Sequence, residues 1–284
     1  MHELHDLLNQ YSLFTKEQEQ VRLKKLLELR EKGIKPYPYK FHITHSIENI
    51  HKDSKTLISQ EIELSTAGRI MSIRSHGKIT FMHIQGSKDK IQLYFRKNEL
   101  NEKYEVIDYL DIGDIIGVRG KVFYTKTGEL TIFVMDYMVL AKSLHPLPEK
   151  WHGLTDRDER YRRRYLDFLV NPASKEKIFI RAKLIKELRR FLDDKGFLEI
   201  DTPILQPLYG GAFAKPFKTY YDALDREYYL RISDELYLKR LIIAGFDKVY
   251  EFGKDFRNEG IDRFHSPEFL QLELYAAYWD YNDV

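Results

Sequence analysis

The segment 249–275, VYEFGKDFRNEGIDRFHSPEFLQLELY, predicts two strands joined by a long polar loop. On the second strand, successive side chains point to opposite faces of a sheet, so Leu270, Leu272 and Leu274 share the face that packs on a core. The opposite face carries an aromatic ring, an amide, a carboxylate and a phenol: Phe269, Gln271, Glu273 and Tyr275. A sheet face of this composition is usually covered by a ligand, so the segment indicates a binding site.

The composition is that of an ordinary globular protein. The chain has 284 residues, enough for two domains, with 43% hydrophobic and 32% charged residues. The net charge of +2 does not by itself indicate a nucleic-acid partner. The absence of cysteine excludes disulfides and thiolate chemistry. We expect a soluble, cytoplasmic protein, because the N-terminus is no secretory signal and no apolar run approaches the ~18 residues of a membrane span.

The N-terminal half predicts a helical extension, residues 1–60, and then a domain of short strands, residues 61–142. A charged helix is expected at 8–32, before Gly33 and two prolines. Five strands separated by turn residues are expected at 62–74, 79–85, 90–95, 115–123 and 130–140. The long gap between the third and fourth strands has helical spacing. This arrangement is typical of an OB-fold barrel, although other small barrels give a similar pattern.

The C-terminal half begins after a proline-containing linker, residues 143–172. A run of three arginines from Arg162 either contacts phosphate or, more often, forms a salt-bridged face. Residues 173–284 start with a helix whose apolar stripe ends at Gly196. The extended strand that follows meets Pro203, which lacks a backbone donor and so marks a sheet edge or an interface.

The order FRNEG, a loop, HSPEF and LELY resembles the second signature motif of class II aminoacyl-tRNA synthetases, and within that class it looks most like lysyl-tRNA synthetases. The helix, the extended strand and Pro203 resemble the first motif of the class, which forms a dimer interface. The resemblance covers about 26–284. It implies an α+β chain: an N-terminal five-stranded OB-fold β-barrel, then the first part of a class II antiparallel-sheet catalytic domain in a homodimer.

The resemblance implies that lysine is attached to tRNA(Lys) with ATP, through a lysyl-adenylate. The nucleophilic carboxylate is already anionic, so the site needs positive charge and in-line positioning rather than a strong base. Arginine suits this task because its planar guanidinium can bridge a carboxylate and a phosphate. By resemblance, Arg257 is this catalytic residue. The other expected ATP contacts are Glu259, His265 and Phe269. Taken alone, Arg257 could instead form a surface ion pair with Glu259 or Asp255.

A lysine pocket must hold two ammonium groups, for which carboxylates and a phenol are suitable partners. The resemblance assigns Glu235 to the α-ammonium group, and Glu273 and Tyr275 to substrate amino groups. Gly211 matches a glycine loop that lets the backbone approach the amino acid. Glu235 also has a simpler interpretation, as an acid in the first turn of a helix capped by Ser233.

The barrel carries a candidate site of its own. Arg74, Phe81 and Gln92 fall on the first three predicted strands, and Glu129 lies at the start of the fifth. Aromatic rings, amides and guanidinium groups bind single-stranded bases by stacking and by contacts to base edges. These positions match those that read the uridine-rich anticodon in lysyl-tRNA synthetases. The alternative for Phe81 is a ring in the barrel core.

The chain departs from the family pattern at several motif positions. Ser233 and Asp234 stand where alanine and proline are usual. At 264–267, Phe-His-Ser-Pro replaces Arg-His-Asn-Pro, and at 212–215, Ala-Phe-Ala-Lys replaces Ala-Ala-Ala-Arg. These changes affect the expected contacts with the ATP phosphates and the edge of the amino-acid pocket.

No glycine-rich run ending in an Asp-Arg pair, the third class II motif, occurs in these 284 residues. We predict no metal ligands here, and we expect the family's Mg²⁺ ligands and a further lysine-pocket glutamate downstream of Val284. The prediction is therefore an incomplete form that is inactive alone. The alternative is a non-catalytic tRNA-binding protein derived from a synthetase. A paralogue that lysylates a protein is a weaker option, because the barrel argues for tRNA.

Overall fold

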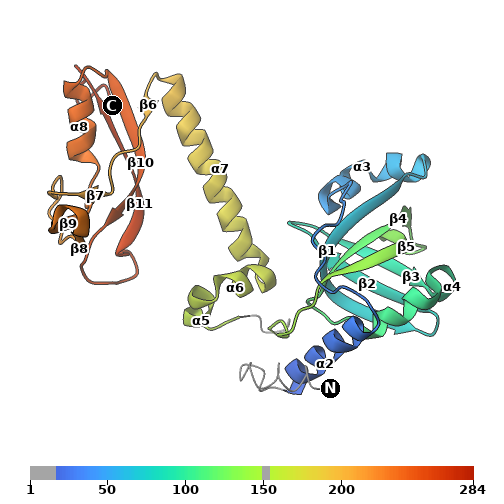
Figure 1. The fold of residues 1–284 in the computed structure, drawn as a ribbon. Helices are drawn as coiled ribbons and strands as arrows, with labels where there is room; N and C mark the ends of the chain where they lie inside the picture. Colours follow the sequence, from blue (N-terminus) through green and yellow to red (C-terminus); the bar gives the residue numbers. More distant parts are fainter. Residues whose placement is uncertain (1–16, 149–153) are drawn as a thin grey trace. The chain divides into compact units, whose positions relative to one another are not determined.

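The computed structural model describes residues 17–148 and 154–284, and the chain divides into two compact units, Met1–Val170 and Asn171–Val284. Each unit contains its own sheet structure (Figure 1). No helix in the described part of the chain is both long and apolar enough to cross a membrane.

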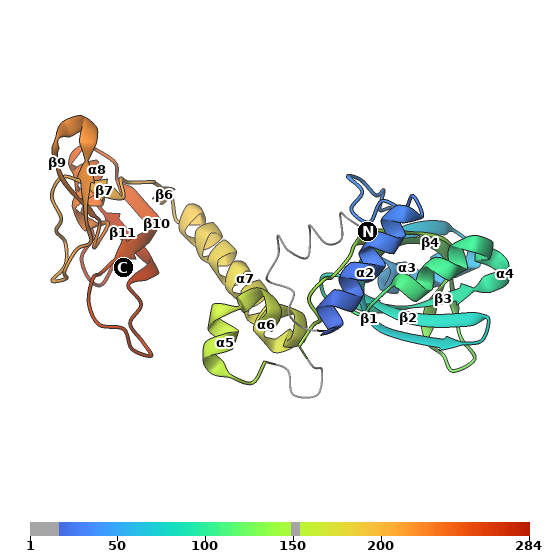
Figure 2. The ribbon, with the colours of Figure 1, turned by 60° about the horizontal axis from the view of Figure 1, so that its bottom comes forward.

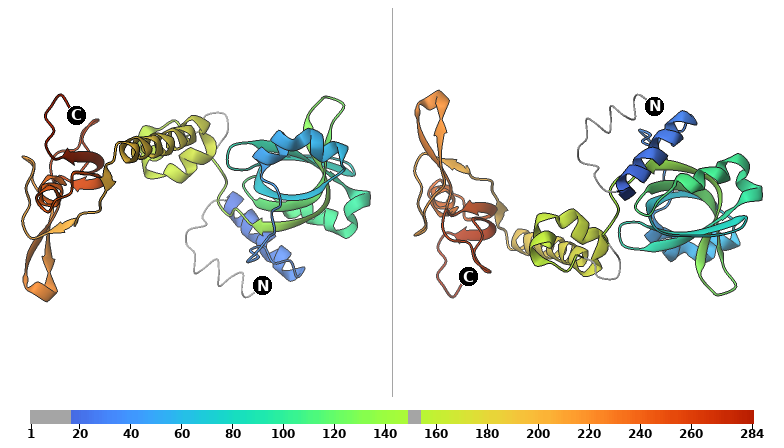
Figure 3. Two further views of the ribbon diagram at one scale, coloured as in Figure 1. Left: turned by 90° about the horizontal axis from the view of Figure 1, so that it is seen from above. Right: turned by 90° about the horizontal axis from the view of Figure 1, so that it is seen from below.

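The first unit is built on a closed five-stranded barrel, which Figure 3 shows end-on. The strand order is β1-β2-β3-β5-β4, and the ring closes through antiparallel pairing of β4 with β1. Only the pairing of β3 with β5 is parallel within the barrel. The strands are β1 (Glu63–His76), β2 (Ile79–Gln85), β3 (Lys90–Arg96), β4 (Ile115–Tyr124) and β5 (Leu130–Ala141). This confirms the predicted five-stranded OB-fold barrel.

Alternation of side chains explains why these segments enclose a core. On β2, Met82 and Ile84 are fully buried, and on β3 so are Leu93 and Phe95, while the residues between them face outward. All five strands contribute residues to one apolar cluster. The outward positions are thereby left free for binding.

The helices of the first unit agree in part with the prediction. α2 (Glu17–Glu31) accounts for the described part of the helix predicted at 8–32, whose first residues lie outside the described part. The gap between β3 and β4 holds α4 (Lys97–Leu100) and a 3₁₀ helix, η1 (Asn101–Tyr109). The helical spacing of this gap therefore forms mostly a 3₁₀ helix.

A further helix, α3 (Ile47–Ser59), was not predicted. It begins after Ser46, whose hydroxyl accepts a hydrogen bond from the backbone N–H of Asn49 at 3.1 Å. Ile47 and Ile50 join the barrel core, and Figures 1 and 2 show α3 next to the barrel. The serine cap was the sequence signal that could have revealed this helix.

The predicted linker is not without structure, because it contains α5 (Arg157–Arg162) and α6 (Arg164–Val170). Each arginine of the run has an acidic partner: Arg162 with Asp158, Arg163 with Glu159, and Arg164 with Asp167. The arginine run is therefore a salt-bridged face, the second of its two interpretations.

The second unit combines two helices with two small sheets. One sheet has the order β11-β10-β6 and the other β7-β9-β8. The helices are α7 (Pro172–Asp194) and α8 (Glu235–Ile243). The strands are β6 (Leu198–Glu199), β7 (Leu205–Gln206), β8 (Lys218–Tyr221), β9 (Arg226–Leu230), β10 (Lys248–Phe256) and β11 (Glu268–Ala276), with a 3₁₀ turn, η2 (Asp222–Leu224), between β8 and β9. Because β6 pairs with β10 in parallel, the first of these sheets is mixed rather than purely antiparallel.

The two faces of β11 separate as the alternation predicts. Leu272 and Leu274 pack on a core cluster formed by Leu192, Phe197 and Tyr250. The other face of the β10–β11 pair carries the polar side chains. In the antiparallel register, Asp255 pairs with Phe269, Gly253 with Gln271, Glu251 with Glu273, and Val249 with Tyr275. This polar face is where the predicted site residues lie.

Candidate functional sites

Glu273 is the centre of the first site. Its Oε1 accepts hydrogen bonds from the Ser233 hydroxyl at 3.0 Å and from the Gln271 amide at 2.6 Å. Its Oε2 accepts from the Tyr275 hydroxyl at 3.2 Å. Gln271, Glu273 and Tyr275 are two residues apart on β11, so they point the same way. The carboxylate is thus held in place from both sides.

Gly211 and Glu235 lie next to this network. Gly211 has φ +86°, a conformation that favours glycine, and a Cβ there would lie 2.8 Å from the Ser233 hydroxyl and 3.0 Å from the Glu235 Cβ. The loop therefore approaches the start of α8 in a way that only glycine permits. Glu235 pairs with Lys239 at 2.6 Å, one turn along the helix. The structure brings the predicted lysine contacts together around Ser233.

Ser233 has a different role from the predicted one. Helix α8 begins at Glu235, with Asp234 at the cap position and no side-chain cap hydrogen bond. The Ser233 hydroxyl accepts from the Glu235 backbone N–H at 3.1 Å while it donates to Glu273. Ser233 therefore links the start of the helix to β11. The interpretation of Glu235 as only an acid at a helix N-terminus therefore leaves out the contact of this segment with Glu273.

Tyr275 is a hydrogen-bond donor under all ordinary conditions. Burial raises the pKa of its phenol, and the nearby carboxylates of Glu273 and Glu235 raise it further. The phenol stays protonated, so it can donate to Glu273 and present a neutral, polar wall to a cation.

Arg257 lies over the ring of Phe269, with 5.0 Å between the guanidinium carbon and the ring centroid. Its Nη2 is 3.5 Å from the Ile232 carbonyl oxygen, and its buried Nε has no hydrogen-bond partner in the described part of the chain. Among the ion pairs of the described residues, none joins Arg257 to Asp255 or Glu259, so the surface-pair alternative is wrong. The guanidinium is left available for an anionic ligand.

Glu259 and His265 lie on the loop between β10 and β11. The Glu259 carboxylate accepts from the Lys215 backbone N–H at 3.2 Å, and the Asn258 N–H donates to the Lys215 carbonyl at 2.7 Å. These bonds tie the glycine loop to the end of β10. His265 is exposed and bonds to Asp262 at 2.7 Å. Of the four predicted ATP contacts, the described contacts join only Arg257 and Phe269 directly, while Glu259 bonds to Lys215 and His265 to Asp262.

Sequence reasoning missed a buried ion cluster below this site. The Arg231 guanidinium is 2.6 Å from Glu251, 3.0 Å from Asp234 and 3.5 Å from Asp255. Arg231 also donates to the Thr202 hydroxyl at 2.9 Å. The signal was the alternation of acids on β10, which puts Glu251 and Asp255 on the polar face.

The barrel site lies on the outer wall. The Phe81 ring is 5.1 Å from the Tyr94 ring, and Tyr94 also contacts the rings of Phe123 and Phe133. Arg74 pairs in register with Phe81 and is exposed. Phe81 is only half-buried and is not part of the core cluster, so the alternative of a core ring is wrong.

Gln92 and Glu129 meet beside these rings. The Gln92 amide donates to Glu129 Oε2 at 2.8 Å, and its oxygen accepts from the Thr131 hydroxyl at 2.8 Å. His83, which sequence reasoning missed, bonds to Glu129 Oε1 through Nε2 at 2.7 Å and to Ser72 through Nδ1 at 3.0 Å. Its signal was the same alternation on β2 that places Phe81 outward. Four predicted residues thus lie on one outer surface, with His83 supporting Glu129.

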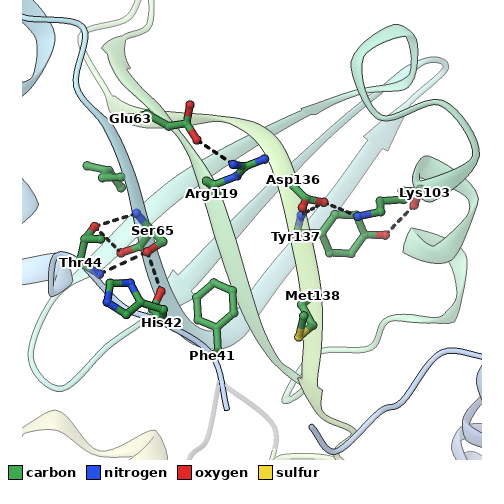
Figure 4. A pocket seen from close by; sticks show the side chains of 11 residues that line it. Phe41, His42, Thr44, Glu63, Ser65, Lys103, Arg119, Asp136, Tyr137 and Met138 are labelled. Atoms are coloured by element: carbon green, nitrogen blue, oxygen red, sulfur yellow. Dashed lines mark hydrogen bonds and ion pairs between the residues drawn. The ribbon is translucent and has the colours of Figure 1, made fainter. Parts of the chain in front are cut away.

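A hollow of about 410 Å³ on the barrel contains neither predicted site (Figure 4). Its charged side chains pair with each other: Glu63 with Arg119 at 3.2 Å, and Lys103 with Asp136. Phe41 and Met138 supply apolar wall. The ion pairs thus satisfy the charged side chains that line the hollow.

A Mg²⁺ site would need oxygen ligands, most often carboxylates, gathered at one place. In the described ranges, no group of three or more histidine, cysteine, aspartate or glutamate side chains could hold a metal ion.

Comparison with known proteins agrees with both units. Residues 156–284 match the family of tRNA synthetases class II (D, K and N), and residues 64–140 match the OB-fold nucleic acid binding domain family. Together with the polar sheet face and the barrel, these matches show that the chain belongs to the class II tRNA synthetases.

Within this class, similar curated proteins include several lysine-tRNA ligases. It is 54% identical over 265 residues to the lysine-tRNA ligase of Carboxydothermus hydrogenoformans, which covers 93% of this chain and 54% of the relative. It is 52% identical to that of Syntrophomonas wolfei, over 96% of this chain and 55% of the relative. It is 49% identical to that of Clostridium botulinum, over 98% of this chain and 55% of the relative. The chain thus spans about half the length of these relatives.

Proposed function

We propose that this chain takes part in the ATP-dependent attachment of lysine to tRNA(Lys) through a lysyl-adenylate, in the cytoplasm. The observation that carries the proposal is the Glu273 network, next to Glu235 and Gly211. Two carboxylates and a protonated phenol fit the two ammonium groups of lysine. An aspartate or asparagine substrate needs cationic or amide groups around its side chain, and Glu273 with Tyr275 disfavours both.

The ATP would bind on the neighbouring part of the same sheet face. Phe269 offers a ring on which adenine stacks, and Arg257 puts a fixed positive charge beside it. In the proposed reaction, the lysine carboxylate attacks the α-phosphorus and pyrophosphate leaves. Arg257 would stabilise the charge on the phosphoryl oxygens, and Glu259 would accept from the adenine amino group. His265 would contact the polyphosphate only after it leaves Asp262.

The barrel would read the anticodon. Phe81 and Tyr94 form an aromatic surface for stacking, and Gln92 and Glu129 lie beside it with atoms that bond base edges. Arg74 is exposed at the same surface and would contact a base or a phosphate. The proposed partner is therefore tRNA(Lys), which would be bound at the barrel and lysylated at the second unit.

A homodimer through the first motif is part of the proposal. On α7, Leu184 and Phe191 are 58% and 57% exposed although both are apolar. In the extended segment that follows, Leu198 and Leu205 are about half exposed, and Pro203 lies between them. Apolar side chains in one continuous helix and strand are suited to cover the same elements of a second copy.

We further propose that these 284 residues bind lysine and RNA but do not catalyse adenylate formation by themselves. They contain the first two motifs and no glycine-rich segment with an Asp-Arg pair. Lysine-dependent pyrophosphate exchange tests this directly. Exchange at the rate of an intact synthetase would overturn the inactivity.

Lysine binding tests the amino-acid site. Calorimetry with the 284-residue chain is expected to detect lysine binding that Glu273→Gln weakens, because the substitution removes the anionic partner of an ammonium group. Glu63→Gln, on the barrel, is the matched control and is expected to leave the lysine affinity unchanged. Equal affinity in the wild type and Glu273→Gln would contradict the proposed pocket.

RNA binding tests the barrel site. Phe81→Ala is expected to weaken the binding of a tRNA(Lys) anticodon stem-loop by about 1–3 kcal/mol if a base stacks on this ring. Tyr39→Ala, at a fully exposed ring outside this surface, is the control. If RNA binds but lysine does not, the non-catalytic tRNA-binding alternative takes the place of the enzyme proposal.

A further inference from the structure

Three carboxylates surround one guanidinium beneath the polar sheet face. Arg231 contacts Glu251 and Asp234 through Nη1 and Asp255 through Nε, at 2.6, 3.0 and 3.5 Å. Asp234 and Asp255 have no exposed surface, and Arg231 and Glu251 have almost none. A single positive charge cannot offset three negative charges in a region that excludes water. The cluster therefore needs another source of positive charge or a proton.

The groups on the neighbouring elements do not remove the excess. Glu273 on β11 adds negative charge near both aspartates, whereas Arg257 adds positive charge near Asp255 only. Glu251 is already satisfied, since its Oε1 contacts Arg231 and its Oε2 accepts from the Thr202 hydroxyl at 2.6 Å. The excess charge therefore falls on the two aspartates.

Asp234 and Asp255 both lie against the Arg231 guanidinium, Asp234 at Nη1 and Asp255 at Nε. All four of their carboxyl oxygens are buried, and apart from these ion pairs none has a hydrogen-bond partner in the described part of the chain. Two ionised carboxylates only accept, so they cannot bond to each other, but one protonated carboxyl can donate to its neighbour. We propose that Asp234 and Asp255 share one proton at neutral pH, and that this pair positions the segment carrying Ser233 and Glu235 against β10.

Gly253 explains how the pair fits. A Cβ at this position would lie 2.3 Å from Oδ2 and 2.6 Å from Oδ1 of Asp234, so the carboxyl lies directly on the backbone of β10. A hydrogen bond between Asp234 and Asp255 then joins the residue before α8 to the strand. Proline is usual at position 234 in the family pattern, so this acid is a departure of the present chain.

The electrostatics agree with this geometry. Burial raises the pKa of Asp234 well above its ordinary range, and the Asp255 charge raises it further against the opposing effect of Arg231. Burial also raises the pKa of Asp255. Because both carboxyl groups lie against one guanidinium, a proton taken up by either one affects the other, and the proposed proton belongs to the pair.

The pair acts on the proposed lysine pocket through the main chain. Ser233 donates to Glu273 and Glu235 begins α8, and both flank Asp234. Loss of the shared proton at alkaline pH would leave two buried carboxylates in contact, which would push Asp234 away from β10. The effect on lysine binding rests on the proposed function, whereas the proton shared by Asp234 and Asp255 does not depend on it.

The first test detects the proton. The infrared carbonyl band of a protonated carboxylic acid is measured at pH 7 on the full 284-residue chain with isotope-labelled aspartate. We expect one buried protonated aspartate in the wild type and none in Asp234→Asn, whose amide donates to Asp255 permanently. A wild type without this band at pH 7 would overturn the proposal.

The second test uses the linkage between protonation and folding. A raised carboxyl pKa in the folded state means that the native state binds more protons, so stability falls as pH rises from about 4, the ordinary aspartate value, through the raised pKa. The stability of the wild type relative to Asp234→Asn should therefore fall over this range. Parallel pH curves would count against the pair. Asp234→Asn is chosen over Asp234→Ala because it keeps the volume and a donor, so it should fold.

Lysine affinity separates the two proposals. We expect the wild type to lose affinity toward alkaline pH more steeply than Asp234→Asn, which lacks the titrating proton. Equal pH dependence in both proteins would contradict the positioning role. If neither protein binds lysine at any pH, the proposed function fails while the infrared band still decides the shared proton.

Discussion

In the barrel, apolar side chains from all five strands point into one closed core, and the polar network of His83, Gln92 and Glu129 lies outside it. In the second unit, the β10–β11 sheet has apolar residues on one face and buried charges on the other. The barrel has paired every strand edge and needs no further cover. In the second unit, buried ion pairs lie beneath the site. Its longest described helix, α7, leaves apolar side chains exposed. The comparison predicts a barrel that relies on its apolar core and a second unit that relies on its ion pairs.

The largest effect is expected for a buried aromatic residue of the barrel, compared with an exposed aromatic residue of the second unit. Phe95 is fully buried and packs edge-on against Tyr137 at 5.4 Å, so Phe95→Ala should lower the free energy of unfolding of the barrel by about 3–5 kcal/mol. Phe191→Ala on α7 should cost under about 1 kcal/mol in the monomer, because the ring is already 57% exposed. Urea unfolding of both variants checks this. Equal losses would break the comparison.

Next in size is the removal of the buried cation. Arg231→Met leaves three buried carboxylates without their counter-charge, which should destabilise the second unit by about 3 kcal/mol. The cost should be smallest at low pH, where the carboxyl groups can take up protons. Thermal unfolding at pH 5 and pH 8 measures both effects. A barrel transition that moves as much as that of the second unit would show that the units are not independent.

The two sites should also respond separately. Glu273→Gln should weaken lysine binding by about 1.5–3 kcal/mol, the range for a hydrogen bond to a charged group. Glu129→Gln, at an exposed carboxylate that is also hydrogen-bonded but lies on the barrel, should leave the lysine affinity unchanged and change the RNA affinity instead. Calorimetry with lysine and filter binding with an anticodon stem-loop measure the pair. A lysine effect from Glu129→Gln would be evidence of coupling between the units.

The smallest expected effect concerns His83. The His83 ring bonds to one carboxylate oxygen of Glu129 and the Gln92 amide bonds to the other. His83→Ala should therefore weaken binding of the anticodon stem-loop by about 0.5–1.5 kcal/mol. His51→Ala on α3 is the matched control, since that ring bonds only to the Lys90 carbonyl among the described contacts. If the His83 variant and its control bind the stem-loop with equal affinity, His83 is not required to hold Glu129 for RNA binding.

The barrel was predictable because β2 and β3 alternate strictly and turn residues separate the strands. Short strands carry little information about what else covers a barrel, so α3 was missed despite its cap at Ser46. In the site, the spacing of Glu273 and Tyr275 placed both on one face. The distance in sequence between Arg231 and Asp255 hid the ion cluster, because no local pattern relates a residue before α8 to one on β10.

The amino-acid order therefore accounts for which face of each strand is polar, since side-chain alternation is a local property of the backbone. It also carries the motif order that relates this chain to the class II tRNA synthetases. Which carboxylates share Arg231, and that Asp234 lies on Gly253 against Asp255, follow only from the packing of α8 and its preceding segment on the sheet. The physical reason is that burial and charge proximity are properties of elements that meet in space, and these set the protonation of the pair.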